Sequence, residues 1–429
     1  MNKTVSALEF LRERDMTCGG ASPEEIAALC REELERGLRG EESSLAMLPS
    51  FIRADLRPRA GEDVLIIDAG GSNLRAARAR FDKQGKLTVG PISKRRMPGT
   101  DGNAISVHTL FSEMALLARE HAEGCAYGCI SFSYPCESLP DGDARILSLC
   151  KELQVSDCEG VRVCETLESE LRALGVSGQR KWRCINDSVG SMLGGIAVRE
   201  RDYDDYIGFI LGTGTNMCCS VPAGSITKSP ECVSLGGEII VNLEFGGLGR
   251  LVRGEADLAL DAESEKPGDH TAEKMIAGRY LPRLLKKTLL LAAEDGILSA
   301  GTAEKLRALT MKARYTDEFY LSPAGGNPLA DALADETERA FAHEVCTLLL
   351  RRAARISAGA LYAILSLRAV RPGSRVCVCA DGSMLRCSPA LLPFIREELA
   401  PAERALGVTV DFTFADDATL LGCAWAGLL

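Results

Sequence analysis

Two segments of the chain share one design, in which a glycine-containing turn joins two strand-like runs. The first, VLIIDAGGSNLRAARARF from Val64, connects a continuous apolar run to an alternating one through the turn DAGGSN at 68–73. The second covers 206–221 and turns at GTGTN, 212–216. Each turn combines glycines, a hydroxyl residue and a terminal Asn. The pattern predicts two hairpins and is compatible with an internal duplication.

The other segments alternate between helical and strand-like patterns. Ser22 to Glu25 reads as a capping box that starts a helix, and a second helix is expected over 106–122. Apolar runs predict strands at 126–134 and 375–380, whereas helical spacing dominates from Thr271 onward. This order predicts an α/β protein.

Length and charge limit the classes of protein to consider. A chain of 429 residues that is 46% hydrophobic exceeds what one domain usually encloses, so we expect two domains with a cleft between them. The formal charge of -10 disfavours a nucleic acid partner. The N-terminal sequence lacks the features of a signal peptide, and no apolar run approaches the roughly 20 residues of a membrane span. We therefore expect a cytoplasmic protein with no membrane partner.

The 17 cysteines form no compact disulfide framework, which fits a reducing compartment. Cys377, Cys379 and Cys387 raise the alternative of a zinc site. The run V-C-V-C points Cys377 and Cys379 to one side of a strand, but no paired knuckle or nearby His completes a ligand set. We interpret these residues as core thiols.

The two glycine turns have the chemistry of phosphate-binding turns. Backbone N–H groups at such a turn can face an anion, and glycine lets a phosphate approach closely. The hydroxyls of Ser72, Thr213 and Thr215 would add donors. Ordinary hairpins also favour glycine and Asn, so either turn alone is ambiguous. The presence of two matching turns favours phosphate binding.

Between the turns lies WRCINDSVGSML, 182–193, in which a strand ends at Asn186-Asp187 and a helix follows from Ser188. Asn-Asp-Ser is a common helix-capping sequence, which is the simplest alternative. Phosphoryl transfer to an alcohol, however, needs a carboxylate that takes the hydroxyl proton. The position of Asp187 between the turns suits that role.

Several separated segments resemble, in the same order, the hexokinase/glucokinase family. The resemblance covers most of the chain and rests on these segments: SSLAMLPSFI, LIIDAGGSNLR, SFSYPC, CINDSVGSML, IGFILGTGTNMC, VNLEFGGLGR, PGDHTAEKMIAGRYL, VCTLLLRR and VCADGSMLRCSP. It implies the two-domain actin-like ATPase (ribonuclease H-like) α/β fold with a central cleft. We expect a small domain of 58–187 plus 415–429 and a large domain of 1–57 plus 188–414.

The resemblance also implies roles for individual residues around a sugar. Asp187 matches the catalytic base, and Lys151 matches a lysine that helps to bind the sugar and to stabilise the moving phosphoryl group. The matching sugar-binding positions are Ser133, Asn186, Asn216, Glu244 and Glu273. Amides and carboxylates of this kind can fix a polyhydroxyl ring. The chain departs from the family at Cys150-Lys151-Glu152, where relatives usually carry Thr-Lys-Gly.

A further set of residues matches the nucleotide-binding positions of the family. It comprises Asp68, Gly70, Gly71, Ser72, Asn73, Arg75, Gly212, Thr213, Gly214, Thr215, Asp381, Gly382 and Ser383. The implied cofactors are ATP and Mg2+, with the metal held by the nucleotide and water and with Asp68 as a water-mediated contact. Relatives normally have a glycine-rich turn before the last helix, where this chain has Asp416, Asp417 and Ala418.

The expected function is an ATP-dependent hexokinase that phosphorylates the 6-hydroxyl of a hexose, glucose first. Three alternatives stay open at this point. One is a catalytically weak hexose-binding sensor, the second is a kinase for another sugar, and the third is an actin-like chaperone or assembly ATPase, which would need no sugar-binding residues. A monomer is preferred over a homodimer.

Overall fold

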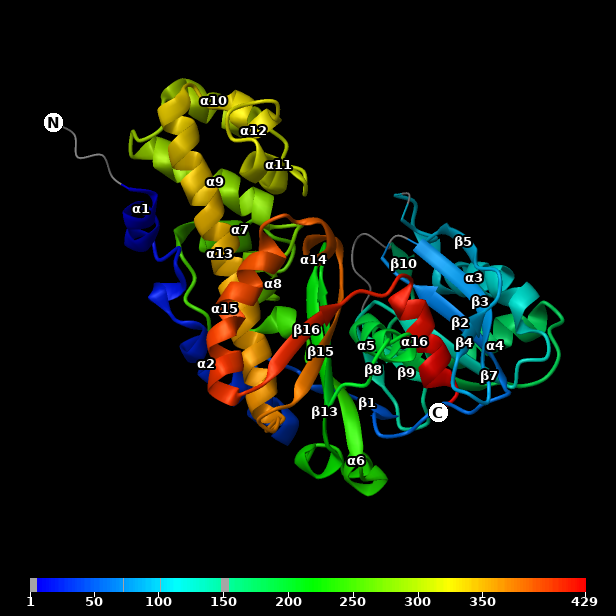
Figure 1. The fold of residues 1–429 in the computed structure, drawn as a ribbon. Coiled ribbons are helices and arrows are strands. Elements are labelled where there is room, and N and C mark those ends of the chain that lie inside the picture. The colour runs from blue at the N-terminus through cyan, green and yellow to red at the C-terminus, as the bar shows by residue number, and fades with distance from the viewer. Residues whose placement is uncertain (1–5, 72, 101, 148–153) are drawn as a thin grey trace.

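The computed structural model describes residues 6–71, 73–100, 102–147 and 154–429. The chain forms two lobes, each built around one mixed sheet, with two central helices between the sheets (Figure 1). Among the described residues, no helix is both long enough and apolar enough to cross a membrane. The two-domain α/β architecture expected from the sequence is therefore observed.

The smaller lobe contains the first predicted hairpin. Its sheet has the order β11-β7-β2-β3-β4, with β5 also paired to β3. Strands β7 and β11 run parallel to β2, whereas β3 runs antiparallel to it. The strands are β2 (Asp63–Ala69), β3 (Asn73–Phe81), β4 (Leu87–Val89), β5 (Ser93–Arg96), β7 (Tyr127–Phe132) and β11 (Lys181–Ile185).

The larger lobe contains the second predicted hairpin, in a sheet of order β1-β14-β13-β12-β15-β16. Its strands are β1 (Leu48–Arg53), β12 (Asp205–Leu211), β13 (Thr215–Pro222), β14 (Glu238–Asn242), β15 (Arg375–Asp381) and β16 (Thr409–Thr413). From β14 to β16 the order and directions match those from β4 to β11 in the other sheet. The repeated turn thus belongs to a repeated sheet topology.

Helices α5 (Asp187–Ala197) and α16 (Ala418–Gly427) connect the lobes. Helix α5 follows β11 of the small lobe and packs on β12 and β15, whereas α16 follows β16 of the large lobe and packs on β2 and β7. The two helices cross at glycines: a Cβ on Gly194 would lie 2.0 Å from the Ala418 carbonyl oxygen, and a Cβ on Gly422 would lie 2.0 Å from that of Gly190. Glycine is required here because the backbones touch.

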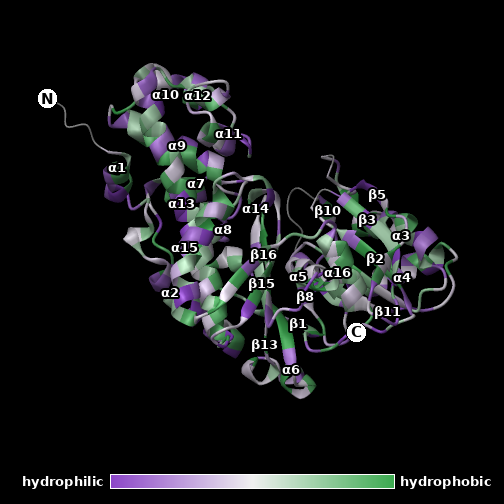
Figure 2. Cartoon of the chain, in the orientation of Figure 1, coloured by the Kyte–Doolittle hydropathy of each residue, from purple (hydrophilic) through white to green (hydrophobic). Residues whose placement is uncertain are grey.

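Other helices cover the outer faces of the sheets. Helices α3 (Val107–Ala122) and α4 (Val163–Ala173) pack on the small-lobe sheet. The large lobe is covered by α2 (Pro23–Arg39), α13 (Glu336–Leu367) and α15 (Leu391–Leu406), and its upper part in Figure 1 is helical. Hydrophilic and hydrophobic residues alternate along these outer helices (Figure 2), as expected for elements with one buried face.

The remaining elements are short or peripheral. They are α1 (Ala7–Glu13), β6 (Ile105–Ser106), β8 (Cys136–Ser138), β9 (Ala144–Ile146), β10 (Val155–Ser156), α6 (Pro230–Leu235), α7 (Glu255–Ala262), α8 (Thr271–Ile276), α9 (Leu281–Glu294), α10 (Ala300–Ala308), α11 (Tyr315–Leu321), α12 (Pro328–Ala332) and α14 (Ser383–Cys387).

Several sequence expectations can be checked directly. The capping box is present, because the Glu25 backbone N–H donates to Ser22 Oγ at 3.2 Å and the Ser22 N–H donates to Glu25 Oε2 at 2.8 Å. Cys377 and Cys379 are buried, as expected of core thiols, whereas Cys387 is exposed. The helical pattern that starts at Thr271 is divided into α8 and α9, with a break at 277–280.

Candidate active site

The candidate catalytic residue Asp187 lies where the small-lobe sheet passes into the central helix α5. The preceding Asn186 is the N-cap: its Oδ1 accepts hydrogen bonds from the Ser188 backbone at 2.9 Å and from Ser188 Oγ at 2.7 Å. The helix-capping role suggested by the sequence Asn-Asp-Ser is therefore filled by the side chain of Asn186. The carboxylate of Asp187 is left for other contacts, among them a hydrogen bond with the Ser133 side chain.

The surroundings of Asp187 favour its protonated form. Burial raises the pKa of Asp187 to about 7, and the negative charges of Glu244 and Asp68 add to the rise. Hydrogen bonds from the Ser188 backbone and the Ser133 side chain act in the opposite direction. A carboxyl with a pKa near neutrality can accept a proton and return it under physiological conditions.

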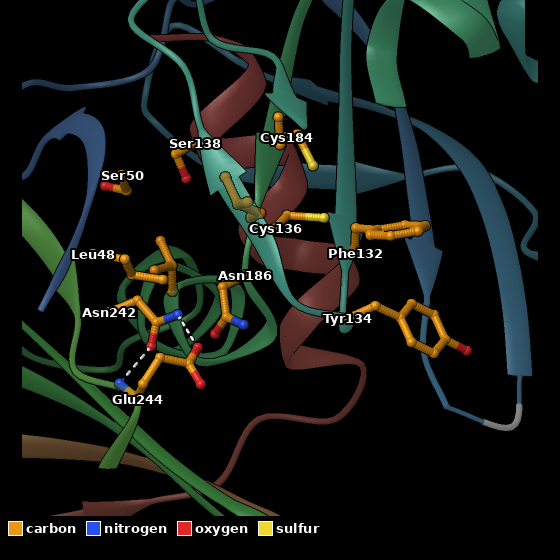
Figure 3. A pocket seen from close by; sticks show the side chains of 13 residues that line it. Leu48, Ser50, Phe132, Tyr134, Cys136, Ser138, Cys184, Asn186, Asn242 and Glu244 are labelled. Carbon is orange, nitrogen blue, oxygen red and sulfur yellow. Dashed lines mark hydrogen bonds between the residues drawn. The ribbon is translucent and has the colours of Figure 1, made fainter. Parts of the chain in front are cut away.

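Amide side chains join three of the predicted sugar-binding residues into one group. Asn216 Nδ2 donates to Asn242 Oδ1 at 2.8 Å and lies 3.4 Å from Asn186 Oδ1. Asn242 Nδ2 in turn donates to Glu244 Oε1 at 2.6 Å (Figure 3). Glu244 has a left-handed backbone with φ 55° directly after β14. The result is a row of alternating donors and acceptors that faces the small lobe.

Glu273 connects this region to the second glycine turn. Its Oε2 accepts a hydrogen bond from the Thr215 backbone N–H at 3.0 Å. A Cβ on Gly214 would lie 2.6 Å from the same oxygen, so the carboxylate rests against the turn itself. Burial raises the pKa of Glu273, and the Thr215 N–H opposes that effect.

A small hollow adjoins these residues and is lined by both lobes. Asn186, Asn242 and Glu244 converge at one end of it, and the hydroxyls of Ser50 and Ser138 line the other side (Figure 3). Its amides, hydroxyls and one carboxylate offer both donors and acceptors to a polyhydroxyl ligand.

The second glycine turn packs against the strand end of β15. A Cβ on Gly212 would lie 3.2 Å from the Ser383 backbone nitrogen, and a Cβ on Gly382, where φ is 100°, would lie 2.4 Å from the Leu211 carbonyl oxygen. The Asp381 carboxylate accepts a hydrogen bond from the Gly382 N–H at 2.8 Å. The structure thus brings the two predicted nucleotide segments of the large lobe together.

The first glycine turn carries an ion pair across its hairpin. Arg75 on β3 donates from Nε and Nη2 to Asp68 Oδ2 on β2, at 3.0 and 2.6 Å. Burial nevertheless raises the pKa of Asp68. Gly70 and Asn73 close the turn through a backbone hydrogen bond of 3.1 Å. Two predicted site residues, Ser72 and Lys151, lie outside the described residues, as do Cys150 and Glu152.

Sequence reasoning missed two polar residues in this region. Asn242 bridges Asn216 and Glu244, and its place two residues before Glu244 in VNLEFGG was the available signal. Arg386 donates to Asp381 at 2.9 Å, and no sequence motif indicated it. Among the described residues, no group of three or more His, Cys, Asp or Glu side chains is arranged to hold a metal ion.

Comparison with known proteins identifies the family of the chain. The family model described as hexokinase matches in two parts, over residues 12–196 and 206–429. Hexokinase-1 of Schizosaccharomyces pombe is 28% identical over 92% of this chain and 85% of its own length. Human hexokinase-3 is 26% identical over 88% of this chain, which spans only 42% of that relative.

Solved structures show the same fold. A hexokinase from Schistosoma mansoni, complexed with glucose, superposes with a TM-score of 0.77 and 21% identity, over 98% of each chain. A ROK hexokinase from Thermus thermophilus gives a TM-score of 0.50 and 15% identity, over 85% of this chain and 97% of its own. These likenesses establish the actin-like ATPase fold. Together with the family match over both halves, they show that the chain belongs to the hexokinase family.

Proposed function

We propose that the protein is an ATP-dependent hexokinase that transfers the γ-phosphate to the 6-hydroxyl of a hexose, with glucose as the first candidate. The observation that carries this proposal is Asp187, a carboxyl with a pKa of about 7 in hydrogen-bonding contact with Ser133. It lies beside the amide row of the large lobe and within electrostatic range of Asp68 near the first glycine turn. A proton acceptor, sugar ligands and phosphate turns are thus close together.

In this proposal Asp187 takes the proton of the sugar hydroxyl as that oxygen attacks phosphorus. A carboxyl with a pKa near 7 is ionised in a large fraction of molecules at neutral pH, and it is more basic than an ordinary aspartate. The Ser133 side chain lowers the pKa of this carboxyl and so favours its ionised form. Asp187 is buried, and no cation is among the causes of its pKa shift. Its ionised form therefore destabilises the fold, and a catalytic role explains why such a residue is present.

The sugar would be bound by Ser133, Asn186, Asn216, Glu244 and Glu273, with Asn242 as a positioning residue between the amides. Because Asn216 Oδ1 accepts from the Met217 and Phe245 backbones at 2.8 and 3.2 Å, the orientation of its amide is fixed. Fixed donors and acceptors discriminate between hydroxyl epimers, since a wrong epimer leaves a buried polar group unpaired.

The phosphate donor would lie between the two glycine turns, with its adenosine toward Asp381, Gly382 and Ser383. Mg2+ would arrive with ATP and be held by its phosphates and water, with Asp68 as a water-mediated contact. In this proposal Lys151 provides a positive charge near the transferred phosphoryl group. The cation would neutralise charge that develops in the transition state.

Closure of the lobes would assemble these parts. We place the domain division at 58–187 plus 415–429 against 1–57 plus 188–414, so that two of its three crossings lie close to the N-terminal ends of α5 and α16. The glycine contacts between these helices leave the crossing free of interlocking side chains. Sugar binding energy used for closure also excludes water, which otherwise competes as a nucleophile.

A coupled assay for ADP release tests the proposal. A panel of glucose, mannose, fructose and amino sugars is offered with ATP and with GTP, and the product is identified by phosphorus NMR. The proposal predicts sugar-dependent release and a 6-phosphate with at least one hexose. Release of ADP at the same rate without sugar would instead support an assembly ATPase. Sugar binding without any transfer would support a sensor.

A further inference from the structure

A row of charged side chains lies along one of the segments that join the two lobes. This segment, residues 414–417, leads from β16 of the large lobe to α16 of the small lobe and is called the linker below. It carries two consecutive carboxylates. The row is formed by Asp68, Arg75, Asp417, Asp416, Arg386 and Asp381. Both of its end members are residues that we assign to the nucleotide.

On the small-lobe side, two carboxylates share one guanidinium. Arg75 holds the buried Asp68 through Nε and Nη2, and its Nη1 donates to Asp417 Oδ1. Arg75 Nη2 also donates to Thr419 Oγ1 at 3.1 Å. The Arg75 side chain is 19% exposed and that of Asp417 is 42% exposed. Each nitrogen of this guanidinium therefore already donates to at least one acceptor.

The large-lobe side repeats the arrangement. Arg386 donates from Nε to Asp381 Oδ1 at 2.9 Å and from Nη2 to the Ala415 carbonyl at 2.5 Å. Its Nη1 lies 3.4 Å from Asp416 Oδ1, and the Asp416 side chain is 99% exposed. Asp416 is thus loosely held at the surface, whereas Asp417 is directed to Arg75 on β3.

The conformation of Asp417 suits this contact. Its backbone is left-handed, with φ 54°, and its side chain makes no capping hydrogen bond to α16. A non-glycine residue in this region carries strain. The carboxylate that would ordinarily cap a helix is instead directed to Arg75.

We infer that Asp417 is a specificity-determining residue for the phosphate donor, because it competes with the donor's phosphates for Arg75. A phosphate that approaches the turn from Gly70 to Asn73 must displace Asp417 from Nη1 or accept its negative charge nearby. Both lower the affinity, and the loss grows with the charge of the phosphate chain. The site consequently favours donors whose charge is already neutralised by a metal. This inference rests on the proposed function for its assignment of the phosphate site.

Asp417→Asn tests the inference directly, because Asn keeps the shape of the side chain and tolerates a left-handed backbone. Asp416→Asn is the matched control, with the same change of charge at the adjacent residue. Calorimetric titration without sugar measures the binding of three ligands. They are a magnesium-bound ATP analogue that cannot be hydrolysed, inorganic tripolyphosphate, and adenosine. Binding is thereby measured independently of catalysis.

Asp417→Asn should tighten the binding of the ATP analogue and of tripolyphosphate by about twofold to fivefold, the range expected when one partly exposed charge contact is removed. Asp416→Asn should change them by less than about twofold, and adenosine affinity should not change in either variant. Unchanged or weaker phosphate binding in Asp417→Asn overturns the inference, and so does an equal gain in Asp416→Asn.

Asp417→Gly is a second variant that tests the same inference, since glycine removes both the carboxylate and the backbone strain. It should show the same gain in phosphate affinity. Tighter phosphate binding in a protein that transfers no phosphate to any hexose would leave the inference standing while the proposed function fails. Normal transfer to a hexose with unaltered phosphate affinity would overturn the inference and leave the proposed function standing.

Discussion

The two glycine turns are alike in sequence and in sheet topology but differ in what supports them. In the second turn the Gly212 N–H donates to the Gly214 carbonyl at 2.9 Å, and the Gly278 N–H donates to the Gly212 carbonyl at 2.8 Å. In the first turn, by contrast, a Cβ added to Gly71 would meet nothing within 4 Å. The second turn is braced by the backbone of a neighbouring segment, whereas the first turn is open beside Gly71 and its Gly70 carbonyl accepts a hydrogen bond from the Tyr134 hydroxyl at 3.3 Å.

This difference indicates that one local design serves two purposes. The braced turn carries Glu273 against Gly214 and so ties the sugar residues to the large lobe. The open turn has a free side on which a phosphate can lie, next to the Asp68–Arg75 pair. Asp187 lies between the two turns in the sequence, and in the proposed function it is the point at which the sugar and the phosphate meet.

The largest expected effect comes from removing the residue between the turns. Asp187→Ala should lower kcat by roughly two to four orders of magnitude, the usual range for a lost general base, while sugar affinity stays within a few fold. Steady-state kinetics and calorimetry with glucose measure the two quantities. Near-normal turnover would show that Asp187 is not the general base, and its position between the two turns would then have no catalytic role.

A smaller effect should separate the two turns. Gly214→Ala places a methyl group against Glu273 Oε2, so the carboxylate has to move, and sugar affinity should fall by about tenfold. Gly71→Ala enters open space and should leave sugar affinity within about twofold while altering only the donor KM. Isothermal titration with sugar compares the variants. Equal losses of sugar affinity in Gly214→Ala and Gly71→Ala would contradict the assignment of the second turn to the sugar and of the first turn to the phosphate donor.

The smallest effect concerns stability. The folded-state pKa of Asp187 lies at about 7, above the ordinary value of 3.8, so ionisation is harder in the folded protein. Its cost is absent below pH 4, grows as pH rises, and is complete above 7. Asp187→Asn should therefore stabilise the fold by about 1–3 kcal/mol at pH 8 and hardly at all at pH 4. Urea unfolding at both pH values measures this, and a gain that is equal at both would contradict it.

The sequence predicted the hairpins well because their signals are local. Alternating and continuous apolar runs, together with glycine and Asn at the turns, define β2–β3 and β12–β13 without tertiary information. The helix from Pro23 was equally readable from its capping box. The division of the segment after Thr271 was not, because the break at 277–280 depends on the Gly278 N–H bonding to Gly212, far away in sequence.

The candidate site shows the same limit. Asn186, Asn216 and Glu244 were predicted from matching motifs, but their connection through Asn242 depends on the register of β13 and β14. The role of Arg75 was only partly predictable. Its pair with Asp68 is a cross-strand contact within one hairpin, whereas its contact with Asp417 joins residues 342 positions apart and needs the fold.

The pH dependence of kcat/KM for the sugar tests the central claim most directly, because it reports the pKa of the base in the nucleotide-bound enzyme before sugar binds. With saturating magnesium-bound ATP, kcat/KM should rise about tenfold per pH unit below 7 and level off above it, and Asp187→Ala should lose this inflection. A profile of the unaltered protein that is flat from pH 5.5 to 8 would contradict the assignment of Asp187 as a general base with a pKa of about 7.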